Sequence, residues 1–142
     1  REKNIPVFHV VHHAPAGAPI FDPNGPMVEI AEQASPVDGE PVIVKNLPSG
    51  FVNTSLQKQI EETGKKSIII SGFMTHMCIN ATARSAVDLG FQPTVVASAC
   101  ATRELPGTSG GTIPADLVHA SNLASLADLV ATIVNTPEDI RD

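Results

Sequence analysis

The sequence predicts an α/β fold built around a parallel β-sheet, and two patterns carry this prediction. Short runs rich in Val and Ile alternate with segments of helical spacing, which is typical of βαβ units. The apolar runs are nearly continuous instead of alternating with polar residues, as expected for strands that are covered on both faces. A chain of 142 residues has the size of one domain, so we expect a single domain over 1–142.

The elements follow in order along the chain. The apolar runs predict strands at 6–12, 41–45, 67–71 and 93–99. Helical spacing predicts helices at 54–63 and 80–89, and each of them ends at a glycine, Gly64 and Gly90. A further helix is expected at 113–125, with Pro114 in its first turn, followed by a last strand at 129–134. The stretch 14–40 is rich in Pro and Gly, which predicts a long loop with at most a short helix at 27–34.

The composition of the chain limits the kinds of partner that we expect it to bind. The net charge is −6 and no basic cluster occurs, which argues against nucleic acid or anionic membranes as partners. No apolar run approaches the roughly 18 residues that a membrane span needs. The sequence starts Arg1-Glu2-Lys3-Asn4 without an apolar leader, so we expect a cytoplasmic protein. Cys78 and Cys100 could pair with each other, but two thiols in a reducing cytosol are the simpler interpretation.

Cys78 is the strongest candidate for a catalytic residue. It follows a predicted strand and a short turn at 73–77, and it is expected to open an amphipathic helix. At a helix start, exposed backbone N–H groups and the positive end of the helix dipole favour a thiolate. The alternative is a buried structural cysteine, since a thiol without a disulfide is among the most buried groups in proteins. Position alone leaves both interpretations open.

Lys45 is the second candidate, because it closes the predicted strand 41–45. The carboxyl edge of a parallel sheet is where open α/β folds bind their ligands. Taken alone, a solvated lysine at a strand end is the ordinary interpretation. Cys78 is expected to leave the same edge of the sheet, however, and a neighbouring cation stabilises a thiolate. The two residues together therefore favour a reactive cysteine.

At this level of detail the sequence resembles the isochorismatase-like hydrolases, a family that includes nicotinamidases and other cysteine amidases. The resemblance covers most of the chain. It rests on the following segments: Val42-Ile43-Val44-Lys45, Ser49-Gly50-Phe51, Thr54-Ser55-Leu56, Ser71-Gly72-Phe73-Met74-Thr75-His76-Met77-Cys78, the helical stretch 81–91 that follows it, and Val95-Val96-Ala97-Ser98-Ala99-Cys100-Ala101-Thr102. The resemblance implies a three-layer α/β/α fold with a central parallel sheet.

The resemblance also implies the chemistry. The family's catalytic triad is an aspartate, a lysine and a cysteine, and Lys45 and Cys78 match the last two. A cis peptide bond is implied between Phe73 and Met74. The backbone N–H groups of Met74 and Cys78 would form an oxyanion hole. Phe51, Phe73 and His76 are the residues that we expect to contact a small-molecule substrate. A homo-oligomer is expected, and no cofactor.

The aspartate of the triad is the point at which the sequence departs from the family. In the family it ends the first strand, and no residue before Pro6 matches that segment. We therefore expect this sequence to lack the family's first strand, with the acid coming from a preceding segment or another chain, unless the chain folds differently. Asp22 and Asp38 precede Lys45, but both lie in the proline-rich loop and are expected to be solvated.

Three histidines near the end of the first predicted strand are candidate zinc ligands. Nicotinamidases carry a zinc near the site, held by an Asp-x-His motif and a second His. His9, His12 and His13 show different spacing and no aspartate in register, so we expect no metal. Histidines that line a pocket or bind solvent are the simpler interpretation.

Two classes of function remain from the sequence. The first is a hydrolase that cleaves the C–N bond of a small amide through an Asp-Lys-Cys triad. The second is a catalytically silent family member or fragment that serves as a binding or assembly subunit, an alternative motivated by the unmatched aspartate. A lesser alternative is vinyl ether hydrolysis, as in true isochorismatases, which generally lack a cysteine at the position of Cys78.

Overall fold

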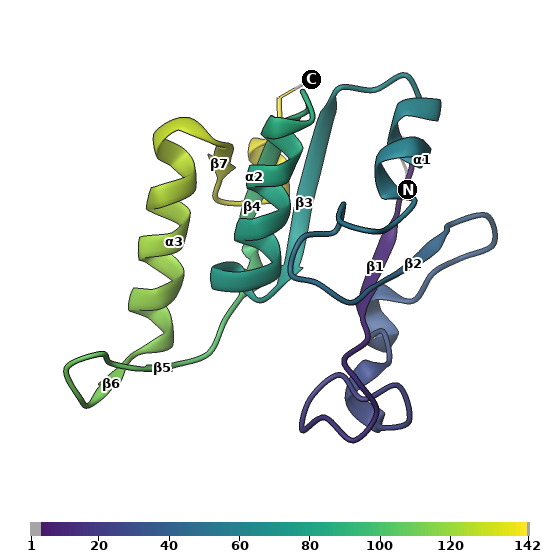
Figure 1. Ribbon diagram of the computed structural model, residues 1–142. Helices are drawn as coiled ribbons and strands as arrows, with labels where there is room; N and C mark the ends of the chain where they lie inside the picture. The colour runs from purple at the N-terminus through teal and green to yellow at the C-terminus, as the bar shows by residue number, and fades with distance from the viewer. Residues whose placement is uncertain (1–3, 142) are drawn as a thin grey trace. The chain divides into compact units, whose positions relative to one another are not determined.

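The computed structural model describes residues 4–141, and the chain divides into two compact units, Arg1–Gly64 and Lys65–Asp142. Each unit contains its own parallel strands and at least one α-helix (Figure 1). The alternation of strands and helices that the sequence predicted is therefore present in both. A single domain over 1–142 stays a prediction. Among the described residues, no helix is long and apolar enough to cross a bilayer.

The first unit is built on two parallel strands and one helix. Strand β1 (His9–His12) pairs in parallel with β2 (Val42–Lys45), and α1 (Leu56–Glu62) follows. The loop between the strands contains two single-turn 3₁₀ helices, Pro26–Val28 and Glu32–Ala34, where the sequence predicted one short helix. Helix α1 ends as expected, because Gly64 adopts the left-handed φ of +70° and closes the last turn.

The second unit is a three-stranded parallel sheet with two helices beside it. Strands β3 (Ser67–Phe73), β4 (Gln92–Ala101) and β7 (Thr132–Val134) lie in the order β3-β4-β7. Helices α2 (Asn80–Asp88) and α3 (Ala115–Leu129) lie side by side next to this sheet (Figure 1). Their inner faces and the sheet enclose a core of five buried residues, Ile79, Ala83, Val95, Cys100 and Leu126.

Both predicted ends of the helix at 113–125 are wrong. Pro114 does not lie inside α3 but precedes it, with an extended ψ of 150°. The helix runs four residues beyond the predicted end at Ser125, to Leu129. Leu126 is the cause, since its fully buried side chain belongs to the core and its carbonyl accepts the N–H groups of Val130 and Ala131.

The glycine-rich stretch after β4 forms a β-hairpin. Strands β5 (Leu105–Pro106) and β6 (Thr112–Ile113) pair in an antiparallel manner. The turn is closed by the Gly107 N–H, which donates to the Gly111 carbonyl over 3.0 Å. A Cβ atom on Gly107 would lie 2.6 Å from the Gly110 carbonyl oxygen, so this close approach of backbone to backbone requires glycine.

The ladder between β3 and β4 contains a large irregularity close to its carboxyl end. Ile70 pairs with Val95, but the next rung joins Gly72 to Cys100, followed by Phe73 with Ala101. One residue of β3 therefore spans the same stretch as four residues of β4, which is a β-bulge. Both strands extend two residues beyond the predicted ends at 71 and 99, because these last two rungs continue the pairing.

Candidate active site

Cys78 lies in the turn between β3 and α2. The turn is a single π-helical turn, Thr75–Ile79, and α2 begins only at Asn80. The expectation that Cys78 opens the α-helix is therefore wrong, because Cys78 lies in the π-helical turn and α2 begins two residues later. The cause is the Met74 carbonyl, which accepts the N–H groups of Met77 at 3.0 Å and Ile79 at 3.3 Å and so widens the turn. Cys78 itself is half-buried and forms no disulfide with another described residue.

The peptide bond that enters this turn has the expected geometry. The bond between Phe73 and Met74 is cis, which confirms what the family resemblance implied. Met74 is extended, with φ −98° and ψ 146°, and stands directly before the π-helical turn. That the N–H groups of Met74 and Cys78 form an oxyanion hole stays a prediction.

His76 lies within the π-helical turn, and Phe73 is the last residue of the strand before it. Nδ1 of His76 is hydrogen-bonded to the Thr102 hydroxyl, which ties the turn to the residues that follow β4. Burial and, secondarily, the positive charge of Arg103 lower the pKa of His76 below its ordinary value. Phe73 is 71% exposed, so its ring is open to solvent. Substrate contact by both residues stays a prediction.

Cys100 occupies a different environment from Cys78. It is buried in the core of the second unit, opposite Gly72 in the ladder. Burial raises the pKa of the Cys100 thiol, an effect that a hydrogen bond from the Gly72 backbone N–H opposes in part. A buried thiol with a raised pKa is unreactive at neutral pH, so the two cysteines are chemically distinct.

In the first unit, Lys45 is buried instead of solvated. Its side chain is only 4% exposed, and its ammonium donates to the Leu47 carbonyl at 2.8 Å and to Nδ1 of His12 at 3.0 Å. The ordinary interpretation of a solvated lysine at a strand end is therefore wrong. A buried lysine is rare unless its charge is compensated by defined partners.

His12 is the partner that the sequence alone did not reveal. It lies directly opposite Lys45 in the β1–β2 ladder. Burial and then the charges of Lys45 and His13 lower the pKa of His12, so the imidazole is neutral and accepts at Nδ1. Its ring also packs on Phe21, with ring centroids 5.2 Å apart. The sequence contains one indication of this contact, because His12 and Lys45 each end a predicted strand and these two strands follow one another along the chain.

His9, another of the three histidines near the end of the first strand, has a separate partner. Nε2 of His9 lies 2.9 Å from the Glu40 carboxylate, and Glu40 also accepts the Val37 N–H. His9 and His12 thus engage different groups. Over residues 4–141, no cluster of three or more His, Cys, Asp or Glu side chains is arranged to hold a metal ion. The absence of a metal from the protein stays a prediction.

The carboxylate of Asp22 forms hydrogen bonds within its own loop. Its carboxylate accepts the N–H groups of Gly17 and Asn24, both at 2.9 Å, and also the Asn24 amide. These hydrogen bonds, that from the Asn24 backbone first, lower the pKa of Asp22 below its ordinary value. The residue stabilises an Asx turn, and a carboxylate with a lowered pKa is a poor general base.

Phe51 lies in the turn between β2 and α1. The residue is buried, and its backbone N–H donates to the Ser49 hydroxyl at 3.2 Å. The same turn is closed by the Thr54 hydroxyl, which donates to the Gly50 carbonyl at 2.6 Å. The sequence predicted a substrate contact for Phe51, and that role stays a prediction.

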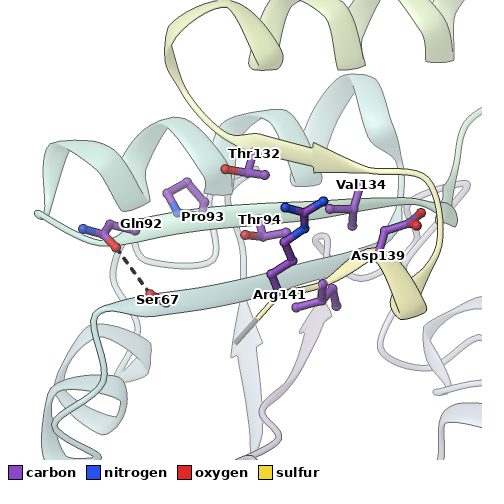
Figure 2. A pocket seen from close by; sticks show the side chains of 9 residues that line it. Ser67, Gln92, Pro93, Thr94, Thr132, Val134, Asp139 and Arg141 are labelled. Carbon is purple, nitrogen blue, oxygen red and sulfur yellow. Dashed lines mark hydrogen bonds between the residues drawn. The ribbon is translucent and has the colours of Figure 1, made fainter.

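Two cavities lie at the opposite ends of the strands from these residues. One of about 440 Å³ opens beside the sheet of the second unit, where the first residues of β3, β4 and β7 line it and Arg141 reaches across (Figure 2). Another of about 590 Å³ lies in the first unit, around 4–8, 37–41 and 59–63. Neither contains a residue that the sequence predicted for the site. Ligands of parallel α/β folds bind at the carboxyl ends of strands, so neither cavity suits the active site.

Comparison with known proteins identifies what the chain is similar to. A family model described as an isochorismatase domain matches residues 1–138. The chain is 42% identical over 137 residues to the isochorismatase family protein YddQ of Bacillus subtilis, covering 96% of this chain and 76% of the relative. It is 38% identical over 138 residues to the secreted isochorismatase effector Isc1 of Verticillium dahliae, covering 97% and 70%.

Solved structures agree with these matches. The crystal structure of an isochorismatase from Pseudomonas putida superposes with a TM-score of 0.92 at 37% identity, over 99% of this chain and 71% of that one. The predicted α/β fold with parallel sheets and flanking helices is thereby confirmed.

More distant relatives include proteins named for amide cleavage. Nicotinamidase 3 of Arabidopsis thaliana is 31% identical over 105 residues, which covers 65% of this chain and 53% of the relative. Maleamate amidohydrolase of Pseudomonas putida is 33% identical over 86 residues, which covers 61% and 40%.

Proposed function

The chain belongs to the isochorismatase family of hydrolases, and from this membership we infer that it cleaves the C–N bond of a small amide through a cysteine nucleophile. Cys78 is that nucleophile. The observation that carries the proposal is the position of Cys78 in the π-helical turn that follows the carboxyl end of the parallel strand β3. Relatives named as a nicotinamidase and as an amidohydrolase support the amide as substrate class.

The chemistry follows from a thiolate at this position. The sulfur attacks the amide carbonyl carbon, and the C=O bond opens to a tetrahedral oxyanion that the N–H groups of Met74 and Cys78 stabilise. The C–N bond then breaks, the nitrogen leaves with a proton from a general acid, and a thioester on Cys78 remains. Water attacks the thioester and releases the carboxylic acid and the thiol. No atom changes its oxidation state in these steps, so the scheme requires no oxidant or reductant.

We propose that Lys45 takes the role of the lysine in the family's triad. Its ammonium is buried and held by the Leu47 carbonyl and His12, which supports a role other than surface solubility. An aspartate completes the family's triad by taking and returning the thiol proton. Asp22 does not suit this task, because its carboxylate is committed to three hydrogen bonds within the loop.

The first test compares the two cysteines of one molecule. We expect iodoacetamide at neutral pH to alkylate Cys78 at least about tenfold faster than Cys100, as measured by peptide mass spectrometry over time. Cys100 is the internal control, because it is buried with a raised pKa. Equal, slow rates at both positions would contradict a nucleophilic Cys78 and would favour a silent binding subunit.

The second test measures turnover by the intact protein. Ammonia release from maleamate and from nicotinamide is followed with and without alkylation, and the intact mass is searched for a thioester. Cys78→Ala is expected to lower kcat by at least about a thousandfold, whereas Cys100→Ala keeps it. A Cys78→Ala protein that still releases ammonia at the original rate would place the chemistry elsewhere.

A further inference from the structure

Helix α3 presents a row of polar side chains to the turn that carries Cys78 and to the helix that follows it. His119, Asn122 and Ser125 recur at every third residue, which places them along one side of the helix. The row makes three contacts: His119 with Thr75 at 2.8 Å, Asn122 with Asn80 at 3.1 Å and Ser125 with Arg84 at 3.1 Å. The sequence alone did not indicate His119, and Arg84 forms hydrogen bonds to two neutral groups, Asn80 and Ser125.

Thr75 is the residue through which this row reaches the nucleophile turn. It is the first residue of the π-helical turn and is fully buried, and its hydroxyl lies against Nδ1 of His119. A buried hydroxyl needs a hydrogen-bond partner, so His119 fixes the rotamer of Thr75. The backbone carbonyl of Thr75 accepts the N–H of Asn80, the first residue of α2. Thr75 is thus held by α3 through its side chain and by α2 through its backbone.

In the contact of Asn122 with Asn80, only one assignment of donors and acceptors is consistent with the neighbouring hydrogen bonds. Nδ2 of Asn122 donates to the Val118 carbonyl at 2.8 Å, which leaves its Oδ1 to accept from Asn80. Oδ1 of Asn80 in turn accepts from Nε of Arg84 at 2.8 Å. Each amide therefore has one orientation, and the start of α2 is fixed against α3 one turn away from the contact of His119 with Thr75.

Apolar packing already attaches α3 to the second unit, since Val118 and Leu126 are buried on the helix. Apolar contacts hold elements together without fixing a side chain's direction, whereas hydrogen bonds also fix orientation. A nucleophile needs such precision, because a displacement of about 1 Å can cost about a hundredfold in rate. We propose that His119 is a positioning residue, which orients Thr75 and thereby the turn that carries Cys78. This inference rests on the proposed function of Cys78.

The experiment pairs isosteric and conservative variants in the full chain. Thr75→Val and His119→Leu remove the hydrogen bond, while Thr75→Ser and His119→Asn keep a group that can form it. Ser121→Ala is the matched control, because the Ser121 hydroxyl bonds only within α3, to the Val118 carbonyl, among the contacts of the described residues. The readouts are kcat and KM for ammonia release from maleamate, and the iodoacetamide rates of Cys78 and Cys100.

We expect Thr75→Val and His119→Leu each to lower kcat by about 10- to 100-fold while KM stays within about twofold, because binding groups are untouched. The double variant should lose no more than either single variant, since both remove one interaction. Thr75→Ser and His119→Asn should recover most of the rate, and Ser121→Ala should match the wild type. The alkylation rate of Cys78 should fall with kcat.

Wild-type kcat in both Thr75→Val and His119→Leu would overturn the proposal. If His119→Leu disturbs the packing of the core, Cys100 will react faster with iodoacetamide than in the wild type. The kcat of Thr75→Val then decides whether the hydrogen bond matters, because valine keeps the shape of the threonine side chain. Losses that add in the double variant would also count against a shared contact. Failure of the proposed function looks different, because wild-type Cys78 would then react no faster than Cys100 and Cys78→Ala would lose nothing.

Discussion

Lys45 and His12 face each other across the parallel β1–β2 ladder, and the Lys45 ammonium lies 3.0 Å from Nδ1 of His12. The pair combines a buried cation with a neutral imidazole whose pKa is lowered by burial and by that cation. Each residue therefore sets the electrostatic environment of the other. The pair can be tested by removing the charge while keeping the length of the side chain.

Lys45→Met is expected to raise the pKa of His12 toward its ordinary value, because one of the charges that lowers it disappears. The measurement is the pH titration of the His12 ring resonances by NMR. If Lys45 serves the proposed amidase, kcat/KM also falls by at least about a hundredfold. Lys58→Met is the control, since Lys58 is 80% exposed on α1 and reaches only Glu62 over 3.9 Å. An unchanged His12 titration in Lys45→Met would contradict the pairing.

The protein is expected to lose stability in mildly acidic solution. The pKa values of His12 and His76 are both lowered from 6.5 in the folded state, so the unfolded chain binds more protons in this range. Their contribution is complete above 6.5 and is lost as the pH falls through each folded pKa. Asp22 does not contribute in this window, because its pKa is lowered from 3.8.

The measurement is the urea unfolding free energy between about pH 8 and about pH 5. We expect a smaller decline in a His12→Gln, His76→Gln double variant than in the wild type, because two titrating groups are gone. Identical slopes in the two proteins would show that other groups dominate the acid response.

Asp22→Asn is expected to leave amide turnover within about twofold of the wild type, because the carboxylate serves the loop and not the reaction. The loop should instead become easier to cleave, because the N–H groups of Gly17 and Asn24 donate to different oxygens of Asp22 and asparagine keeps only one of these acceptors. Limited proteolysis followed by mass spectrometry locates the cuts within 14–40. Loss of turnover with an intact loop would identify Asp22 as a member of the catalytic machinery.

The end of α3 offers a matched pair of leucines. Leu126 is fully buried and Leu129 is 88% exposed on the same helix. We expect Leu126→Ala to lower the unfolding free energy by about 3–5 kcal/mol, from lost burial and the cavity left behind. Leu129→Ala should change it by no more than about 0.5 kcal/mol. Equal effects in denaturant titrations would mean that the last turn of α3 does not hold the core.

Local patterns in the sequence predicted the elements well, because their causes are local. Continuous apolar runs marked β1, β2, β3 and β4, and Gly64 stopped α1 where a left-handed residue was needed. The place of Cys78 after a strand also followed from a local pattern, whereas the cis bond before it was implied by the family resemblance. These features depend on residues that are close together along the chain.

Most of the features that escaped prediction depend on residues far apart along the chain. The burial of Lys45 results from the register that sets it against His12, 33 residues away. The extra turn of α3 results from the packing of Leu126 into the core, and the contact of His119 with Thr75 spans 44 residues. The π-helical turn at Cys78 is local, but it depends on the Met74 carbonyl accepting two N–H groups, which no residue type signals.

The bulge between β3 and β4 has a consequence for how related proteins diverge. Four residues of β4, Val96–Ala99, span the stretch that Ser71 alone spans on β3, and only then do Gly72 and Cys100 pair. A change in the length of this stretch would shift Thr102 against His76 while the inner rungs at Ile70 and Val95 kept their register. Val96, however, pairs with Val134 of β7, and Cys100 belongs to the core, so a change of length would also disturb the packing of the second unit. Substitutions at the exposed Ser98 and Ala99 are therefore the way to reshape this rim for substrates of another size.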